Sequence, residues 1–453
     1  MLNLSNAAQL IGAEQRGADA EFAAVTTDSR AIARGDLFVA LRGERFDGHD
    51  FVAQALAQGA AAVLVDQADP AWGEIPLLLV KDTRLALGQL AAQWRLRHDV
   101  ALAAITGSSG KTSVKEMLHA ILRAAAGEGA VLATAGNFNN DIGLPLTLLK
   151  LRATHRYAVI EMGMNHPDEI AYLSGLAKPA VALINNAQAA HLAGLGSLEA
   201  VARAKGEIFE GLAADGTAVI NGDDAYAGMW RELAGARRVL SFGLKPGADV
   251  SATFQLTPSG SELGVVTPRG KFAVSLQAPG EHNVRNALAA IAAAMALGID
   301  EAAIVRGLAG FQPVKGRLLA KSALHGATLI DDSYNANPGS MRAAIDTLSL
   351  YPGNRALVLG DMGELGIDAP RLHREIGEYA KQAGIEKLFV LGELSRETAV
   401  GFGVGARHFE YIEDLLHEVE NLLAPGVTVL VKGSRFMKME RVVKSLEKEA
   451  ACC

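Results

Sequence analysis

The sequence predicts an α/β protein built from three domains, and three observations support this prediction. The chain has 453 residues, which at about 150 residues per domain suggests about three domains. Short apolar runs alternate with helical patterns along most of the chain. One stretch, residues 250–277, breaks this alternation. We expect the domains to span residues 1–99, 100–314 and 315–453.

Residues 1–99 predict a small domain of mixed α and β elements. The segment 26–51 is rich in glycine and aspartate and contains an apolar strand, "LFVAL". A helix ("VAQALAQGA") and a strand ("AAVLV") follow, and a further helix covers roughly 84–97. The string "RHDV" at the end of this helix is interpreted as a linker.

Residues 100–314 predict a central domain with a mostly parallel sheet plus a small antiparallel sheet. The apolar runs "ALAAI", "YAVIEM", "VALINNA" and "TAVIN" have helices between them. Such runs suit strands that are buried on both faces of a parallel sheet. Residues 250–277 instead alternate apolar and polar side chains, which predicts an antiparallel meander. An alanine-rich helix follows over 281–298 and ends in glycine.

Residues 315–453 predict a second domain of alternating strands and helices, with a Rossmann-like arrangement. The expected strands are "ATLIDDS", "RALVLGD", "KLFVLG" and "TVLVKGS". One of the intervening helices covers 369–383, and a last helix is expected from about 434 to 450. In that last helix, Met439, Val442, Val443 and Leu446 share one face.

The composition excludes several classes of protein. Half of the residues are hydrophobic and 21% are charged, which favours folded domains over disorder. The net charge of −7 argues against nucleic acid as the main partner. We find no apolar run long enough to cross a membrane and no signal peptide, so no membrane insertion is expected. The cysteines, Cys452 and Cys453, are adjacent near the end of the sequence and fit a reducing cytosol.

The string "TGSSGKT" (106–112) predicts a P-loop that binds ATP or GTP. Gly107, Ser108, Ser109 and Gly110 have small side chains, so their backbone N–H groups can point at phosphate oxygens. Lys111 would reach the β- and γ-phosphates, and the Thr112 hydroxyl would bind Mg²⁺. Ile105 stands where the general motif has its first glycine, so the match is incomplete. No Asn-Lys-x-Asp string occurs, which argues against a guanine-reading switch.

Two further residues follow apolar strands of the central domain. Glu161 ends the strand "AVIE", where a carboxylate could hold the magnesium; a helix-capping or surface glutamate is the alternative. His191 follows "VALINN". Histidine is a less usual partner for magnesium, and a lone histidine is more often packed or solvated, so residue chemistry alone leaves its role open.

Separate segments in all three domains carry a resemblance to a known family: "TGSSGKTSVKEML", "GNFNNDIGLPLTLL", "IEMGMN", "NNAQAAHL", "AKGEIF", "GEHNVRNALAA", "PVKGR", "DDSYNANPGSM", "LGDMGELG" and "KGSR". In this order they resemble the Mur ligases, which extend the peptide of the bacterial cell-wall precursor. The pairing of "DDSYNANP" with "LGDMGELG" resembles the F-type branch. That branch joins D-alanyl-D-alanine to UDP-N-acetylmuramoyl-tripeptide.

Other members of the family are less similar. The E-type ligases, which add the third residue, are expected to carry Asp-Asn-Pro-Arg, and this string is absent. Folylpolyglutamate synthases share the ATP domain, but the segment "DSRAIARGDLFVALRGERFDGHDF" resembles the UDP-binding module of the E and F types. A ligase that adds a single amino acid remains the alternative within this class. A nucleotide-dependent switch or transport ATPase, which would hydrolyse ATP without forming a bond, is the alternative from another class.

The resemblance implies an ATP-dependent amide ligase that works through an acyl phosphate. Lys111 would contact the phosphates, Thr112 and Glu161 would hold a first Mg²⁺, and His191 would help to hold a second. Lys205 matches the lysine that is carbamylated in this family; an ordinary exposed helix lysine is the alternative.

The ATP site would also include residues from both sides of the second domain boundary. Asn283 and Asn286 lie three apart on one helix face, and their amides suit an adenine edge, with helix capping as the alternative. By the resemblance, Arg317 would meet phosphate and Asp331 the ribose hydroxyls. Asp332 could make the ribose contact instead.

The resemblance also implies contacts for the two other substrates. They are Ser29 and Arg30 for the uridine nucleotide; Asn137, Asn139 and Asn140 for the muramoyl-peptide; Tyr334, Asn335 and Asn337 for the dipeptide; and Lys432, Ser434 and Arg435 for a carboxylate. Polar turns and a helix start capped by Ser434 are the structural alternatives. No role follows from the sequence for Asp361 or Glu364. We expect a monomer in the bacterial cytoplasm, and the sequence leaves open whether the tripeptide ends in diaminopimelate or lysine.

Overall fold

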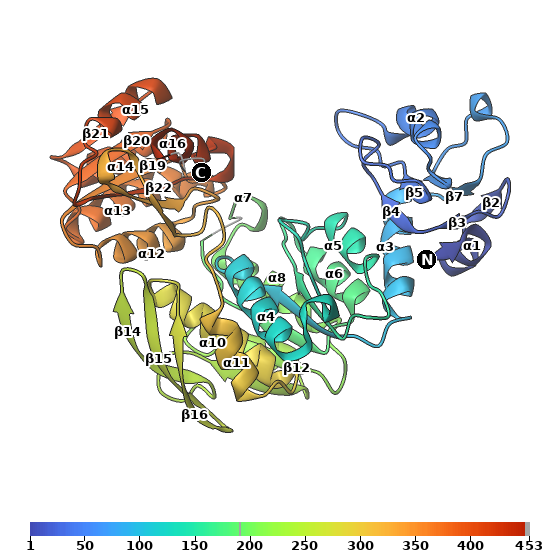
Figure 1. Ribbon diagram of the computed structural model, residues 1–453, viewed down its shortest axis with the longest axis horizontal. Helices are drawn as coiled ribbons and strands as arrows, with labels where there is room; N and C mark the ends of the chain where they lie inside the picture. The colour runs from blue at the N-terminus through green and yellow to red at the C-terminus, as the bar shows by residue number, and fades with distance from the viewer. Residues whose placement is uncertain (190–191, 449–453) are drawn as a thin grey trace, which may run out of the picture.

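The computed structural model describes residues 1–189 and 192–448. It contains three α/β bodies that follow one another along the chain (Figure 1). The N-terminal body and the C-terminal body lie on opposite sides of the central one (Figure 1). The predicted fold class, α/β with three domains, is confirmed.

The N-terminal body has a five-stranded sheet in the order β2-β7-β6-β5-β4. Strands β4 to β7 pair in parallel, whereas β2 pairs antiparallel with β7. A two-stranded ribbon, β1 with β3, lies beside α1. The bounds are β1 Leu2–Asn3, α1 Leu4–Ile11, β2 Glu14–Arg16, β3 Glu21–Phe22, β4 Ala24–Thr26, β5 Asp36–Val39, α2 Val52–Ala57, β6 Ala62–Val65, β7 Leu77–Leu79 and α3 Thr83–Arg95.

The central body has a six-stranded sheet, β13-β12-β11-β8-β10-β9, whose strands are all parallel. Alternate residues of each strand enter two different cores, because side chains alternate across a strand. Ala103 and Ile105 of β8 pack with α4 and α10, whereas Leu102 and Ala104 belong to the core on the other face. The strand bounds are β8 Ala101–Thr106, β9 Val131–Ala133, β10 Tyr157–Glu161, β11 Val181–Ile184, β12 Thr217–Asn221 and β13 Arg238–Phe242.

Helices cover both faces of this sheet, and the expected antiparallel meander is present. Its strands are β14 (Ser251–Thr257), β15 (Gly260–Thr267) and β16 (Gly270–Leu276). The helix bounds are α4 Lys111–Ala126, α5 Gly143–Leu148, α6 Glu169–Ala177, α7 Leu192–Leu195, α8 Leu198–Gly206, α9 Ala227–Ala234, α10 Glu281–Ala296 and α11 Glu301–Ala309.

The C-terminal body has the sheet order β17-β18-β22-β19-β20-β21, with only β17 antiparallel to its neighbour among the described strands. Helices alternate with the parallel strands, as expected. The bounds are β17 Leu319–Ser322, β18 Thr328–Asp332, α12 Pro338–Leu348, β19 Asn354–Gly360, α13 Ala369–Gln382, β20 Lys387–Leu391, α14 Ser395–Phe402, β21 Ala406–Phe409, α15 Ile412–Glu420, β22 Val427–Lys432 and α16 Glu440–Leu446.

The last helix is shorter than predicted. A short 3-10 turn, Arg435–Met437, comes first, and α16 begins at Glu440. Lys438 between them has a left-handed backbone with φ of 51°, which interrupts a continuous helix. The predicted apolar face is nevertheless buried. The end predicted at residue 450, like Cys452 and Cys453, lies outside the described residues.

Over the described ranges, no helix is long and apolar enough to span a bilayer. The loops that matter for function follow the carboxyl ends of the parallel strands. In open α/β sheets this edge is where ligands bind. Strands β8, β10 and β18 end there in polar residues, and Asn185 directly follows β11.

Candidate active site

A cleft of about 1530 Å³ lies where the central and C-terminal bodies face one another. Its walls include the P-loop, the ends of β10 and β11, and the start of α10. The C-terminal body contributes the loops after β18 and β22 and the start of α12. Arg84 and Leu85, near the start of α3, are the lining residues from the N-terminal body.

The P-loop leads directly into α4, and the space around Gly110 is too small for any side chain. This residue has φ of 78°, in the left-handed region that favours glycine. A Cβ there would lie 2.4 Å from Asn286 Oδ1 and 2.6 Å from Asn185 Nδ2. Lys111 Nζ donates a 2.6 Å hydrogen bond to the Gly107 carbonyl. Burial lowers the pKa of Lys111, and the charge of Glu161 opposes this.

Glu161 lies beside Thr112, as a shared magnesium site requires. Parallel pairing of β10 with β8 sets Glu161 opposite Ile105, so its buried carboxylate is at the P-loop edge. Thr112 Oγ1 donates to Glu161 Oε2 at 3.0 Å, and Asn139 Nδ2 donates to Oε1 at 2.8 Å. Glu161 is therefore neither a surface residue nor a helix cap.

This donor set fits magnesium. A hydroxyl and one carboxylate are hard oxygen ligands, and Mg²⁺ is usually bound by one or two carboxylates together with substrate phosphates and water. No cluster of three or more His, Cys, Asp or Glu that could hold a metal is found among the described residues. His191 lies outside the described residues, and its metal role stays a prediction.

Asn185, Asn186 and Gln188, which directly follow β11, surround the P-loop. Asn186 accepts the N–H of Ser108 through its carbonyl at 3.0 Å and the N–H of Ser109 through Oδ1 at 2.9 Å. Ser109 Oγ donates to Gln188 Oε1 at 2.9 Å. The backbone N–H groups of Ser108 and Ser109, which were expected to face phosphate, are thus bonded to Asn186 in this structure. The sequence signal for these contacts was the run of Asn and Gln side chains after a strand, and it was not used in the prediction.

Asn283 and Asn286 are buried and line the cleft. Neither caps α10, since its N-cap is Gly280. Asn286 Nδ2 donates to Asn283 Oδ1 at 3.2 Å, and Asn286 Oδ1 accepts from Asn185 at 3.0 Å. This chain of amides ties α10 to the P-loop edge of the sheet. Burial, with the nearby positive charges of Lys432 and Arg285, lowers the pKa of the neighbouring His282 to about 4.

The C-terminal body touches the P-loop across the cleft. Arg317 Nη2 donates to Thr112 Oγ1 at 3.3 Å, and its guanidinium lies 4.3 Å from the Tyr334 ring centroid. Asn337 Nδ2 donates to Ser109 Oγ at 3.0 Å. Asn337 is also the N-cap of α12, so it has both the capping role and a contact in the cleft.

The two neighbouring aspartates at the end of β18 have different positions. Asp332 lines the cleft, whereas Asp331 does not. Asp331 is buried and accepts from Ser333 at 2.6 Å. Successive side chains point to opposite faces of a strand, so of the two neighbours Asp332 is the one at the cleft, which favours the alternative over Asp331. The ribose contact itself stays a prediction.

Lys432 is bonded to protein groups rather than open to a carboxylate ligand. It lies opposite Asp332 in the pairing of β18 with β22, and its Nζ is 2.6 Å from Asp332 Oδ2. Nζ also donates to the Asn335 carbonyl at 2.9 Å. Burial lowers the pKa of Lys432, and Asp332 opposes this.

The remaining residues of the expected carboxylate and dipeptide sites lie at the cleft with local bonds. Ser434 Oγ accepts the Gly363 N–H at 2.8 Å, and it does not cap the helical turn that follows. Arg435 pairs with Glu440 at 2.8 Å. Asn335 Oδ1 accepts the next backbone N–H, a turn contact.

The three asparagines after β9 divide into different roles. Asn139 bonds Glu161, as described above, and Asn137 lines the cleft. Asn140 Oδ1 accepts the Gly143 N–H at 2.9 Å, which supports the turn into α5. Asn140 also lines the cleft, so this turn contact does not exclude the predicted contact with the muramoyl-peptide, which stays a prediction.

Lys205 on α8 is buried, with 1% of its surface exposed. The alternative of an ordinary exposed helix lysine is therefore wrong. Burial lowers the pKa of Lys205 well below its ordinary value, and the charge of Lys111 adds to this.

The pair with no predicted role, Asp361 and Glu364, follows β19. Asp361 Oδ1 accepts the Ser395 N–H at 2.7 Å, so it supports the start of α14. Glu364 lines the cleft and has φ of 63°, in the left-handed region.

Ser29 and Arg30 lie outside the cleft lining, in the N-terminal body. Arg30 pairs with Asp28 at 2.8 Å and its side chain is exposed, as the polar-turn alternative expects. Hydrogen bonds from Arg30 lower the pKa of Asp28 to about 2.

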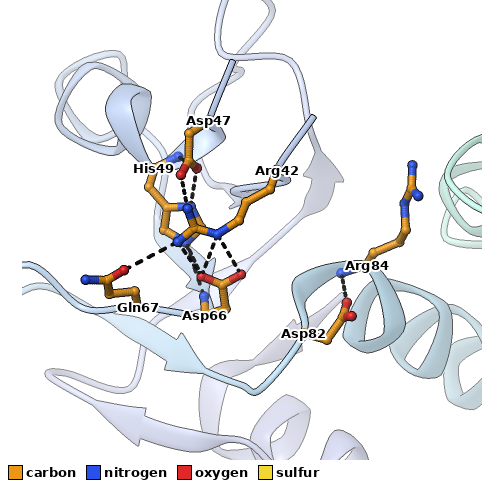
Figure 2. Close-up of polar contacts among 7 residues, drawn as sticks. All are labelled: Arg42, Asp47, His49, Asp66, Gln67, Asp82 and Arg84. Carbon is orange, nitrogen blue, oxygen red and sulfur yellow. Dashed lines mark hydrogen bonds and ion pairs between the residues drawn. The ribbon is translucent and has the colours of Figure 1, made fainter. Parts of the chain in front are cut away.

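A polar network in the same body was not predicted from the sequence. Figure 2 shows Arg42 between Asp47 and Asp66, with His49 beside them. Arg42 Nη2 lies 2.9 Å from Asp66 Oδ1, and His49 Nδ1 lies 2.5 Å from Asp47 Oδ1. The network fixes the loop 42–49. Figure 2 also shows that Arg84, whose N–H is capped by Asp82, extends away from this network.

A P-loop on a parallel sheet, facing a second α/β body across a shared cleft, defines an ATP-dependent enzyme built from three bodies. Three family models match consecutive parts of the chain: the Mur ligase family catalytic domain over 21–95, the Mur ligase middle domain over 105–294, and the Mur ligase glutamate ligase domain over 316–435. The chain belongs to the Mur ligase family, as the sequence motifs predicted.

Relatives match over nearly the whole chain. The UDP-N-acetylmuramoyl-tripeptide–D-alanyl-D-alanine ligase of Escherichia coli K12 is 47% identical over 100% of this chain and 99% of its own length. The enzyme of that name from Bacillus subtilis is 39% identical, covering 93% and 92%. The predicted resemblance to the F-type branch is confirmed.

Solved structures agree. MurF from Acinetobacter baumannii is 39% identical with a TM-score of 0.91, covering 98% of both chains. MurF from Thermotoga maritima, solved in complex with ADP, is 28% identical with a TM-score of 0.82, covering 93% of this chain and 96% of that one. Mycobacterium tuberculosis folylpolyglutamate synthase, at 18% identity and a TM-score of 0.64, shares the fold alone.

Proposed function

We propose that this protein joins D-alanyl-D-alanine to UDP-N-acetylmuramoyl-tripeptide and converts ATP to ADP and phosphate. The observation that carries the proposal is identity of 47% over the full chain to a ligase of that name. It is supported by a cleft whose two walls bring the P-loop opposite a second set of polar residues. The product serves peptidoglycan synthesis in the cytoplasm of a bacterium, and the working unit is the monomer.

The reaction proceeds through an acyl phosphate. An oxygen of the tripeptide carboxylate attacks the γ-phosphorus and ADP leaves. The dipeptide amine then attacks the activated carbonyl, and the tetrahedral intermediate expels phosphate as the nitrogen loses its proton. The protein supplies alignment and charge neutralisation.

Lys111 and Arg317 supply the positive charge. Each is buried or half-buried next to Thr112, and they come from opposite walls of the cleft. Charge that develops on a transferring phosphoryl group is stabilised by such fixed cations. Because Arg317 belongs to the C-terminal body, binding of ATP and approach of the two walls are coupled.

Thr112 and Glu161 would hold a first Mg²⁺, and His191 a second. The ions would supply charge neutralisation that lets a carboxylate approach the γ-phosphate. The Thr112–Glu161 distance of 3.0 Å supports the first of these sites. Asn139 keeps the Glu161 carboxylate oriented toward Thr112.

Lys205 is carbamylated in the working enzyme. A neutral amine is the form that reacts with carbon dioxide. Burial lowers the pKa of Lys205, which increases the fraction of the neutral amine. The carbamate would replace a buried cation with an anion near the second magnesium. A buried anion suits a metal partner far better than an apolar environment.

The substrates are divided among three domains, 1–99, 100–314 and 315–453. The first holds the uridine nucleotide, with Ser29 and Arg30 at its polar turn. The central domain holds ATP and, through Asn137 and Asn139, the muramoyl-peptide. The third would hold the dipeptide through Tyr334, Asn335 and Asn337, with Ser434 and Arg435 near its carboxylate. Lys432, which pairs with Asp332, would support this pocket from within the protein.

The direct test is a coupled assay with purified protein, ATP, Mg²⁺, UDP-muramoyl-tripeptide and D-Ala-D-Ala. Phosphate release should require both the tripeptide and the dipeptide, and mass spectrometry should detect the pentapeptide product. Tripeptides ending in diaminopimelate and in lysine should be compared. Phosphate release that needs neither acceptor nor dipeptide would favour a nucleotide switch, and use of a single amino acid in place of the dipeptide would favour another ligase.

A further inference from the structure

Lys115 is a buried cation that the proposed reaction does not use. It lies on α4, one turn after Lys111, so both side chains project from the same side of the helix. Only 1% of Lys115 is exposed. Its Nζ donates to the Thr134 carbonyl at 2.6 Å and pairs with Glu116 Oε1 at 2.6 Å.

Thr134 connects this lysine to the metal carboxylate. It directly follows β9 and is 1% exposed. Its N–H donates to the Val159 carbonyl at 3.0 Å, and its Oγ1 accepts the Glu161 N–H at 3.0 Å. The Thr134 carbonyl is therefore bonded to α4, and its N–H and hydroxyl are bonded to β10.

The segment that begins at Thr134 reaches Glu161 a second time. Asn139 Nδ2 donates to Glu161 Oε1 at 2.8 Å, and the Gly163 N–H donates to the Asn139 carbonyl at 2.8 Å. Both the backbone and the carboxylate of Glu161 are thus held by residues 134–139. The position of this segment decides where the carboxylate points.

A buried ammonium is a costly way to fill space, because a charge loses its hydration when it leaves water. An apolar side chain would fill the same volume without that cost. Although burial opposes the shift, hydrogen bonds from His119 and Lys115 lower the pKa of Glu116 to about 2, so Glu116 is an anionic partner for this lysine at neutral pH. Beyond filling space, the ammonium contributes a hydrogen bond to the Thr134 carbonyl.

We propose that Lys115 is a positioning residue, which holds Thr134 and through it sets Glu161 for binding of the magnesium–nucleotide complex. The proposal rests on the proposed use of ATP and magnesium at this site. It predicts an effect on metal-dependent nucleotide binding that loss of a buried cation elsewhere would not cause.

The test uses Lys115→Met in the full chain, with a non-hydrolysable ATP analogue as the probe. Calorimetry with Mg²⁺ and with EDTA separates the magnesium-dependent part of the affinity. Outer-shell partners of metal ligands are worth about 10- to 100-fold in metal affinity, so we expect a loss of about tenfold in the presence of Mg²⁺. With EDTA, the affinity should stay within about twofold of wild type, because Lys115 does not face the nucleotide cleft.

The nucleotide-free protein gives a second measurement. The Glu161 N–H, which depends on Thr134 Oγ1, should exchange with deuterium faster in the variant than in wild type. Unchanged exchange in peptide 157–163 together with unchanged magnesium dependence would overturn the proposal.

Arg95→Met is the matched control. Arg95 is also buried and donates to three carbonyls, those of Ala177, His98 and Val100, at 3.1, 2.9 and 2.9 Å. It is absent from the cleft lining. This variant should unfold at a lower temperature and keep the wild-type magnesium dependence. An equal loss of magnesium dependence in both variants would show that general destabilisation is the cause, which would also overturn the proposal.

Thr134→Val gives a second route should Lys115→Met fold poorly. It removes the hydroxyl that accepts the Glu161 N–H and keeps the backbone carbonyl. We expect the same loss of magnesium dependence, and no further loss when the two changes are combined, because both break one chain of contacts. Additive losses would contradict the proposed chain. If wild type binds the magnesium–nucleotide complex and the variants lose it, the inference stands even where the ligation assay fails.

Discussion

Replacing Lys432 with methionine is expected to destabilise the C-terminal body by about 3–5 kcal/mol, because it leaves one partner of a buried ion pair unpaired. Lys432 Nζ lies 2.6 Å from Asp332 Oδ2, and side-chain exposure is 4% for the lysine and 9% for the aspartate. The pair joins the neighbouring strands β18 and β22 at the edge of the cleft. The Asn335 carbonyl loses its donor as well.

The size of this loss should depend on pH. Burial already raises the pKa of Asp332, and the charge and hydrogen bond of Lys432 oppose the rise. Without the lysine, the pKa of Asp332 rises further. A carboxyl whose pKa is raised by folding contributes stability that is present below its unfolded pKa, about 3.9, and is lost as the pH rises through its folded value. The variant should therefore be closest to wild type near pH 4 and fall further behind toward neutral pH.

Hydrogen exchange of the backbone amides in β18 and β22 measures this stability locally, which suits a chain of several bodies. The matched control is Lys432→Met combined with Asp332→Asn. It removes the unpaired charge, so it should recover much of the stability, since the large cost of breaking a buried pair comes from the charge left uncompensated. Equal losses in the single and double variants, or a loss that does not change with pH, would refute the reasoning.

Three further outcomes are expected. Lys111→Ala should lower the ligation rate by at least about 100-fold, because a cation at the developing phosphate charge is lost, while circular dichroism stays unchanged; near-normal turnover would contradict the phosphate role. Lys205→Ala should be inactive and regain part of its ligation rate when short carboxylic acids are added, whereas full activity without them would rule out a required carbamate. Gly377→Ala places a methyl 2.0 Å from the Thr398 carbonyl between α13 and α14 and should cost about 1–3 kcal/mol in thermal unfolding. Its control, Gly175→Ala in α6, meets nothing within 4 Å and should be neutral or stabilise by up to about 1 kcal/mol; the same sign for both would contradict the packing argument.

The sheets could be predicted best where their strands are buried on both faces. Strands such as β8 and β22 are apolar almost throughout, which separates them from helices and loops. The edge strand β21 (Ala406–Phe409) was missed, because only Phe409 of its residues is buried and its sequence, "ARHF", lacks an apolar run. The break at Lys438 depends on one backbone angle, which no apolar pattern encodes.

The site was predictable where the chemistry is local. The P-loop places its glycines, lysine and threonine within seven residues, so its pattern is visible in the string itself. The choice between Asp331 and Asp332 depends on which face of β18 each side chain occupies. The cage around the P-loop depends on Asn185 and Asn186 meeting residues more than 70 positions earlier. Contacts of this kind become visible only when the chain is folded.

The two structural roles of Asn337 have a consequence for inhibitor resistance. Its side chain caps α12 and also reaches Ser109 on the opposite wall. If a compound bound this amide, a resistance substitution at Asn337 would also remove the helix cap. Loss of such a cap costs about 0.5–2 kcal/mol of stability. Drug pressure on the residue would thus be opposed by the folding requirement of the body that carries it.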